Sequence, residues 1–258
     1  MDLTEYRNSE SEKSRVADLM SLLPQTSGSA LDIGSRDGFI SRLLAERYSK
    51  VTALDLELPD IEHERIICAK GDITALAFTD ASFDLVFCAE VLEHIPPDRL
   101  QSACDEMSRV AREHVLVGVP YKQDIRVACT TCSHCGKSNP PWGHVNSFDE
   151  ARLCRLFPDL EVCRTSHVGK TNDRTNGLSA ALMNMAGNPY GTYSQEEPCV
   201  HCGKDLGQPR ERRVWQKVAT KIAFVVRGVQ NVFLPTENSK WIHLLLRHRL
   251  SVEQRNLR

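Results

Sequence analysis

Short apolar segments alternate with amphipathic segments along residues 30–120 of this chain. The apolar segments are rich in β-branched residues and end in polar turns, whereas the segments between them carry apolar residues at helical spacing. Such alternation is typical of a parallel sheet with helices on both faces. The sequence therefore predicts an α/β fold with a doubly wound, mostly parallel sheet.

The pattern returns after residue 147 and again near the C-terminus, which brings the expected sheet to seven strands. The predicted strands span residues 30–34, 50–56, 65–72, 83–91, 114–120, 160–168 and 241–248. The predicted helices span residues 12–23, 39–48, 97–112, 148–157, 176–186 and 210–233, and the third is expected to open at Pro97.

Two segments interrupt this rhythm. Residues 121–147 are polar, contain three cysteines and the run NPPWG, and residues 171–239 contain a second cysteine pair. We interpret both as insertions on the acceptor side of a core domain. That core is expected to comprise residues 1–120, 148–170 and 240–250.

Composition sets limits on location and partners. The N-terminal residues are polar and acidic with no apolar run, which predicts no secretory signal and a cytoplasmic protein. From residue 200 onward, twelve Lys or Arg stand against four Asp or Glu, so this part carries +8 within a chain of net charge −2. A basic end could meet phosphate groups, nucleic acid or an anionic membrane, or could simply be a solvated surface.

The stretch ALDIGSRDGFISRLL predicts a ligand site. Its strand runs through Asp32 into a turn with Gly34 and Gly38, and a helix follows at once, which is how open α/β sheets build nucleotide sites. Asp55 ends the next strand, where a carboxylate can accept hydrogen bonds from two ribose hydroxyls. Asp72 ends the third strand on the same rim. The turn lacks the G-x-G-x-x-G spacing of a dinucleotide site.

Together, LDIGSRDG, ALDLE, KGDITALAFTDASFDLVFCAEVLEHI and HVLVGVP resemble the class I S-adenosylmethionine-dependent methyltransferases. The similarity is greatest to the branch that includes the ubiquinone-biosynthesis methyltransferases, and it covers roughly residues 10–170 and the final strand. It implies a Rossmann-like fold and S-adenosyl-L-methionine as the cofactor.

The resemblance also implies roles for individual residues. The turn would hold the methionine end of the cofactor, Asp55 the ribose, and Leu56 one face of the adenine, with Asp72, Ile73 and Cys88 completing the site. One position departs from the family, which usually has glycine where Arg36 stands. The cofactor residues expected from the resemblance are Asp32, Gly34, Ser35, Arg36, Gly38, Asp55, Leu56, Asp72, Ile73 and Cys88.

Candidates for the transfer step follow the fourth and fifth strands. The segment EVLEH sets Glu90, Glu93 and His94 beyond the fourth strand, and His144 follows the fifth. We name Glu93, His94 and His144 as catalytic candidates, because a histidine can take a proton near neutral pH. The same set could instead bind a divalent cation, or EVLEH could simply start a helix whose Glu93 and His94 serve as caps.

The hexapeptides CSHCGK and CVHCGK predict a metal site. Cys132 with Cys135, and Cys199 with Cys202, each form Cys-x-x-Cys followed by Gly-Lys. Two such turns supply the four thiolates of a closed structural zinc site, which would form a small zinc-ribbon-like element. Cys129 is an alternative to Cys135, because CTTC is also Cys-x-x-Cys.

The helix expected over residues 210–233 has a broad apolar stripe and nearby basic residues. Such a stripe usually packs on its own domain, but it could also touch a membrane or a lipid-linked substrate.

The sequence thus favours a methyltransferase acting on a small-molecule, saccharide or lipid-linked acceptor, most simply on oxygen. The zinc element and the basic end leave an RNA methyltransferase as an alternative. A further alternative is a non-catalytic zinc-ribbon binding protein on a methyltransferase scaffold. The sequence does not indicate an oligomeric state.

Overall fold

The computed structural model describes residues 7–209, 211–233 and 237–249, and for residues 231–233 the backbone only. The described chain forms two compact units. The core unit comprises residues 7–121, 148–169 and 241–249, and the insertion unit comprises the described parts of residues 122–147 and 170–240. Residues 1–6 and residue 250, which we assigned to the core, lie outside the described residues.

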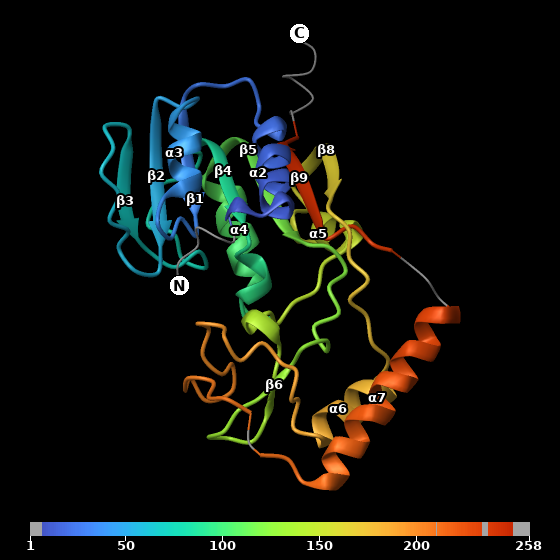
Figure 1. The fold of residues 1–258 in the computed structure, drawn as a ribbon. Helices are drawn as coiled ribbons and strands as arrows, with labels where there is room; N and C mark the ends of the chain where they lie inside the picture. Colours follow the sequence, from blue (N-terminus) through green and yellow to red (C-terminus); the bar gives the residue numbers. More distant parts are fainter. Residues whose placement is uncertain (1–6, 210, 234–236, 250–258) are drawn as a thin grey trace. The chain divides into compact units, whose positions relative to one another are not determined.

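A seven-stranded sheet forms the centre of the core unit, in the order β3-β2-β1-β4-β5-β9-β8 (Figure 1). The first five of these strands are parallel, and β9 is antiparallel to both of its neighbours. The predicted mostly parallel sheet is therefore confirmed. Its strands are β1 (Ser29–Ile33), β2 (Lys50–Asp55), β3 (Ile66–Lys70), β4 (Phe83–Ala89), β5 (Ala111–Pro120), β8 (Leu160–Val168) and β9 (Trp241–His248).

Helices cover both faces of this sheet. Successive side chains of a buried strand point to opposite faces, so each face carries apolar side chains that pack against helices. In β4, Val86 and Cys88 join the cluster beneath α4 (Leu100–Val110) and α5 (Glu150–Leu156). Leu85 and Phe87 join the cluster beneath α2 (Glu10–Leu22) and α3 (Phe39–Ala45).

The third predicted helix is shorter than expected. It does not open at Pro97: Arg99 donates its backbone N–H to the Pro96 carbonyl in a turn, and α4 begins one residue later. At the other end, Ala111 is already extended, so the predicted helical residues 111 and 112 belong to β5. Pairing with β4 from Phe83↔Ala111 onward replaces the last helical turn.

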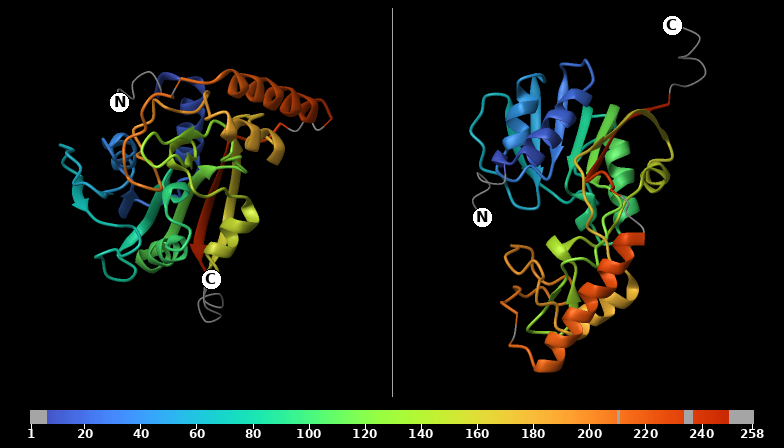
Figure 2. Two further views of the ribbon diagram at one scale, coloured as in Figure 1. Left: turned by 90° about the horizontal axis from the view of Figure 1, so that it is seen from below. Right: turned by 45° about the vertical axis from the view of Figure 1, so that its right-hand side comes forward.

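The insertion unit contains two helices that lie side by side, α6 (Gly177–Met185) and α7 (Val214–Phe233) (Figure 2). It also contains a two-stranded antiparallel sheet of β6 (Thr130–Thr131) and β7 (Ser138–Asn139), which was not predicted within the insertion 121–147. Helix α7 begins four residues later than predicted, and Arg210 lies outside the described residues.

Leu85→Ala should destabilise the core unit by about 2–5 kcal/mol, since Leu85 is fully buried and its truncation leaves a cavity. Leu58→Ala is the matched control, because 63% of the Leu58 side chain is exposed. Urea unfolding followed by circular dichroism measures both. Equal loss of stability in the two variants would contradict the assigned core.

Candidate cofactor and metal sites

The carboxyl ends of β3, β2, β1 and β4 form one edge of the sheet. In register, Ile33 of β1 lies beside Leu54 of β2 and Cys88 of β4, and Asp55 lies beside Lys70 of β3. The chain reverses strand order between β1 and β4, and open α/β sheets bind ligands at such a switch point. All the predicted cofactor residues follow or end these four strands.

The turn after β1 is tied to β2 through its backbone. Gly34 and Ser35 both donate their N–H groups to the Leu54 carbonyl, at 2.9 and 3.2 Å. Gly34 and Gly38 have φ of 79° and 78°, a region that favours glycine. A Cβ on Gly34 would also lie 2.4 Å from a methyl group of Val91. Glycine is thus required here by the packing of the protein itself.

Arg36 shares this left-handed conformation, with φ of 47°. This backbone accounts for the glycine that the family usually has at this position, since glycine adopts it without a Cβ penalty. The Arg36 side chain is exposed, so it is not packed into the turn. Its backbone N–H donates to Asp55 Oδ2 at 2.9 Å.

Asp55, at the end of β2, therefore fixes the turn after β1 to the loop after β2. Its other oxygen accepts the N–H of Leu56 at 2.7 Å, and carboxylate oxygens retain further lone pairs for hydroxyl donors. Leu56 is 67% exposed, which leaves its apolar surface available to a flat ring. These features fit a ribose and an adenine at the positions that the resemblance implies.

Asp72 is fixed one strand further along. The backbone N–H and hydroxyl of Thr74 donate to Oδ1, and Arg99 donates to Oδ2 at 2.8 Å. The Thr74 backbone hydrogen bond, the Thr74 hydroxyl and Arg99 hold the pKa of Asp72 below its usual value. Ile73 and Cys88 are buried, and burial raises the pKa of the Cys88 thiol well above its usual range.

Asp32 is a buried carboxyl at the end of β1. Burial raises the pKa of Asp32 from 3.8 to about 7, although the Ser41 hydroxyl donates to it at 2.5 Å. Nearby, Ser35 Oγ is buried and has no hydrogen-bond partner among the described residues. A buried hydroxyl without a partner, three residues after a buried carboxyl of raised pKa, fits a polar ligand group that would bind here.

Glu93 and His94 follow β4 in a short 3-10 turn, Leu92–His94, where the alternative interpretation expected the start of a helix. Glu93 is fully buried, and neither of its carboxylate oxygens has a hydrogen-bond partner among the described residues. Burial, with Glu90 nearby, raises the pKa of Glu93 well above its usual range. Burial, with Arg36 adding to it, lowers the pKa of His94 to about 4.

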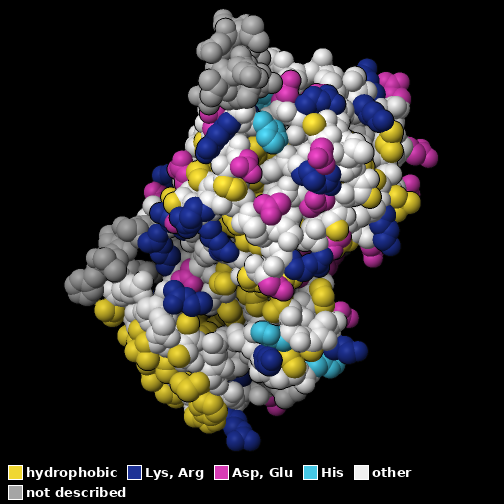
Figure 3. Space-filling model, turned by 180° about the vertical axis from the view of Figure 1, so that it is seen from behind, with side chains coloured by type: hydrophobic (Ala, Val, Ile, Leu, Met, Phe, Trp, Pro, Cys, Tyr) yellow, Lys and Arg dark blue, Asp and Glu magenta, His cyan; other side chains and the backbone are white. Residues whose placement is uncertain are grey.

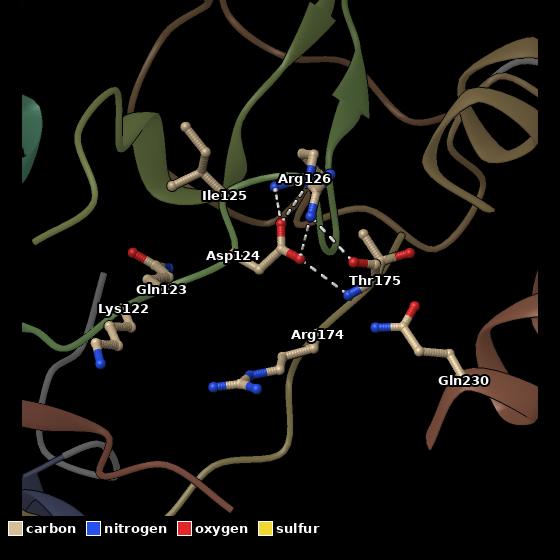
Figure 4. A pocket seen from close by; sticks show the side chains of 8 residues that line it. All are labelled: Lys122, Gln123, Asp124, Ile125, Arg126, Arg174, Thr175 and Gln230. Atoms are coloured by element: carbon tan, nitrogen blue, oxygen red, sulfur yellow. Dashed lines mark hydrogen bonds and ion pairs between the residues drawn. The ribbon is translucent and has the colours of Figure 1, made fainter. Parts of the chain in front are cut away.

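His144 belongs to the insertion unit, where its Nδ1 lies 2.6 Å from Gln123 Oε1. Gln123 also lines a pocket of about 530 Å³ in this unit (Figure 4), which the sequence analysis did not anticipate. Within the pocket wall, Arg126 donates to both oxygens of Asp124 at 2.8 and 2.9 Å. The other residues of the lining are Lys122, Ile125, Arg174, Thr175 and Gln230.

Four cysteine thiols of the insertion unit converge. Their sulfurs all lie within 4.8 Å of one another, with Cys132 3.7 Å from Cys202 and Cys135 3.8 Å from Cys199. Zinc–sulfur bonds of about 2.3 Å give a tetrahedron with edges of about 3.8 Å, so this arrangement fits a zinc ion. Cys129 is outside the group, and its thiol donates to the Ile125 carbonyl at 3.3 Å.

The two cysteine turns have the same backbone hydrogen bonds. The first cysteine of each donates its N–H to the lysine carbonyl five residues on, and its carbonyl accepts the N–H of the glycine. Gly136 and Gly203 have φ of 71° and 66°. The N–H of Cys135 and that of His134 lower the pKa of Cys132 to about 6. Val200 donates its N–H to Asn139 Oδ1, a link that the sequence analysis missed.

Residues 31–117 match the model of a methyltransferase domain family. The matched residues contain β2 to β4 and most of β1 and β5, and they include the acidic residues Asp55 and Asp72 at or just after the strand ends. Residues 31–117 of the core unit are thus similar to a methyltransferase domain in sequence as well as in fold.

Curated relatives match over a limited length. The chain is 34% identical over 85 residues to the ubiquinone biosynthesis O-methyltransferase of Idiomarina loihiensis, covering 29% of this chain and 35% of the relative. It is 32% identical over 93 residues to the enzyme of the same name from Xylella fastidiosa, covering 32% and 38%. The chain thus spans little more than a third of the length of these relatives.

Solved structures show the same methyltransferase fold over most of the chain. The N-methyltransferase NodS of Bradyrhizobium japonicum, in complex with S-adenosylhomocysteine, aligns with a TM-score of 0.53 at 16% identity, covering 96% of this chain and 93% of that one. The 1,6-didemethyltoxoflavin-N1-methyltransferase of Burkholderia thailandensis aligns with a TM-score of 0.54 at 13% identity, covering 96% and 82%.

Gly34→Ala should destabilise the core unit by about 1–3 kcal/mol, because it adds a Cβ at positive φ and against Val91. Gly177→Ala is the control, since a Cβ there meets nothing within 4 Å. Thermal unfolding of both variants tests this. A normal melting temperature for Gly34→Ala would contradict the described turn.

Proposed function

We propose that this protein transfers a methyl group from S-adenosylmethionine to an oxygen of a small-molecule, saccharide or lipid-linked acceptor. The observation that carries the proposal is the sheet edge at which Asp55, Asp72 and the Gly34–Gly38 turn meet at the switch point of a methyltransferase domain. The ubiquinone biosynthesis relatives are named O-methyltransferases, which supports oxygen as the acceptor atom.

The cofactor supplies an electrophilic methyl group when it is bound. In our proposal Asp32, Ser35 and the glycine turn bind its methionine end, Asp55 accepts the ribose hydroxyls, and Leu56, Asp72 and Ile73 contact the adenine. Cys88 lies near the carboxyl end of β4 with its side chain in the core beneath α4 and α5, so we propose that the backbone around Cys88 lines the reacting centre. Positioning of acceptor and cofactor can supply most of the rate.

A hydroxyl acceptor must lose its proton as the oxygen–carbon bond forms. We propose Glu93, His94 and His144 as the groups that hold or receive this proton. His94 is neutral at physiological pH because its pKa is about 4, so it can accept a hydrogen bond from a hydroxyl. Burial raises the pKa of Glu93 well above its usual range, which favours the protonated carboxyl, and in that form Glu93 would hold a proton and donate a hydrogen bond.

The pocket of the insertion unit supports an acceptor that carries anionic groups. Its lining contains three basic side chains, those of Lys122, Arg126 and Arg174. Arginine and lysine recognise phosphate and carboxylate groups through charge-assisted hydrogen bonds. We therefore infer that phosphate or carboxylate groups of the acceptor bind here.

We further propose that the four-cysteine cluster binds a structural zinc ion. Four sulfur ligands leave no open coordination position, so the metal would stabilise the insertion unit and would not activate water.

Asp55→Asn should weaken binding of S-adenosylhomocysteine roughly 10- to 100-fold, the usual effect of losing a hydrogen bond to a charged group. The exposed Asp60→Asn is the control and should bind normally. Isothermal titration calorimetry measures both. If the wild-type protein does not bind S-adenosylhomocysteine, the proposed function fails.

Transfer itself is tested with methyl-labelled S-adenosylmethionine and metabolite extracts separated into aqueous and lipid phases. Label should appear in an acceptor, and mild acid hydrolysis should leave it as a stable methyl ether. Label attached to nitrogen or sulfur would contradict the oxygen assignment.

Binding should also depend on pH through Asp32. The unfolded chain releases this proton near pH 3.8 and the folded chain near pH 7, so Asp32 lowers stability progressively as the pH rises through that window. A bound ammonium group favours the carboxylate, so affinity for S-adenosylhomocysteine should rise as the pH passes 7. Asp32→Asn should flatten that rise, and calorimetry on both sides of pH 7 measures it.

Metal analysis of the purified protein should find about one zinc ion per chain, as one four-thiolate site requires. Cys199→Ser should lose the metal and lower the stability of the insertion unit, because metal binding contributes to folding. Cys129→Ser is the control and should retain the metal, since Cys129 lies outside the cluster. Loss of zinc in Cys129→Ser would overturn the ligand assignment.

A further inference from the structure

The large apolar side chains of α7 face outward. From the sequence we expected the apolar stripe of this helix to pack on its own domain. In the structure, most side chains of the stripe have half or more of their surface exposed. Figure 3 shows hydrophobic side chains gathered on one side of the insertion unit. The exposed fractions are Val214 78%, Trp215 53%, Val218 50%, Ile222 48%, Val225 65% and Val229 53%.

Small residues form the packed side of the same helix. Ala219, Thr220 and Ala223 are buried, and the buried Ser179 of α6 donates its hydroxyl to the Ala223 carbonyl at 2.8 Å. Small side chains let two helices approach closely, so α6 holds α7 by this face. The opposite face, with the valines, is left on the surface of the unit.

The charge on α7 has one sign. Residues 214–233 contain no Asp or Glu, and Lys217 and Lys221 are exposed one turn apart. At 100° per residue, both lie along one border of the apolar face, next to Val214 and Val225. Within the described part of the chain, no carboxylate forms an ion pair with either lysine. Helix α6 adds the exposed Leu178 and Met185 and also has no acidic residue.

We propose that this face of α7 docks on a bilayer surface that contains anionic lipids. An apolar face bordered by lysines is how a helix lies in the interfacial plane, with its apolar side chains among the acyl chains and its lysines at the headgroups. Trp215 suits the interface, because its ring is apolar and its N–H is polar. No described helix is long and apolar enough to cross a bilayer, so the contact is with the surface.

A second copy of the chain is a poorer occupant. If two α7 faces packed together, the lysines of both copies would meet at the border of the interface with no acidic residue of either helix to pair with them. Anionic headgroups supply the missing negative charge, at about fivefold in affinity for each lysine near the surface. The positive charge of α7 therefore favours an anionic bilayer over a second copy of the chain.

This inference goes beyond methyl transfer and does not depend on it. It would place the enzyme where a lipid-linked acceptor is found, but the face could dock whatever the acceptor is.

Co-sedimentation of the full chain with phosphatidylcholine vesicles, with and without phosphatidylglycerol, tests the proposal. The wild-type protein should bind the anionic vesicles and bind the neutral ones far less. The double variant Val218→Gln/Val225→Gln should lose binding, whereas Val162→Gln, at an exposed valine of the core unit, should not. Lys217→Gln and Lys221→Gln should each weaken binding about fivefold, and only to anionic vesicles.

A second measurement does not depend on the fold of any valine variant. Trp215 emission of the wild-type protein should shift to shorter wavelength and be quenched by brominated acyl chains, and Trp215→Phe should remove that response. Absence of vesicle binding by the wild type would overturn the proposal, as would equal binding to neutral and anionic vesicles. A dimer in sedimentation velocity that the valine variant abolishes, without vesicle binding, would assign the face to self-association.

Discussion

The structure depends on the parallel pairing of β1 with β2 on one side and β4 on the other. This pairing brings three loops, distant in sequence, to one edge of the sheet, and the Leu54 carbonyl then fixes the turn after β1 by accepting two backbone N–H groups. Asp55 completes the link by binding the N–H of Arg36. The residues that we propose to bind the cofactor are thus positioned by the sheet itself.

The insertion unit is organised by a different interaction, the meeting of two similar cysteine turns. Each turn is closed by its own backbone hydrogen bonds and a left-handed glycine, so the local sequence builds each half. The halves are 67 residues apart in their first cysteines, and only the fold of the unit joins them. Val200 and Asn139 show this, since their hydrogen bond ties the second turn to the small sheet of the first.

Much of the core could be predicted because its signals are local. Buried strands bounded by polar turns are recognisable in the sequence, and all seven strands of the sheet were predicted, β8 and β9 at their observed bounds. The boundary between α4 and β5 could not be found this way, because pairing of Ala111 with Phe83 decides it. The strands β6 and β7 were missed since two residues carry no periodicity.

The sequence by itself determined the α/β class, the strand-end acids, the glycine turn and the four cysteines, since each follows from residue type and spacing. Only the tertiary structure decided which side of α7 is buried. The periodicity shows that its valines share a face, but the choice of contact rests on close packing of Ala219 and Ala223 against α6. Burial of Glu93 and Asp32 was equally hidden, because the pKa of a carboxyl depends on neighbours that the fold brings from elsewhere in the chain.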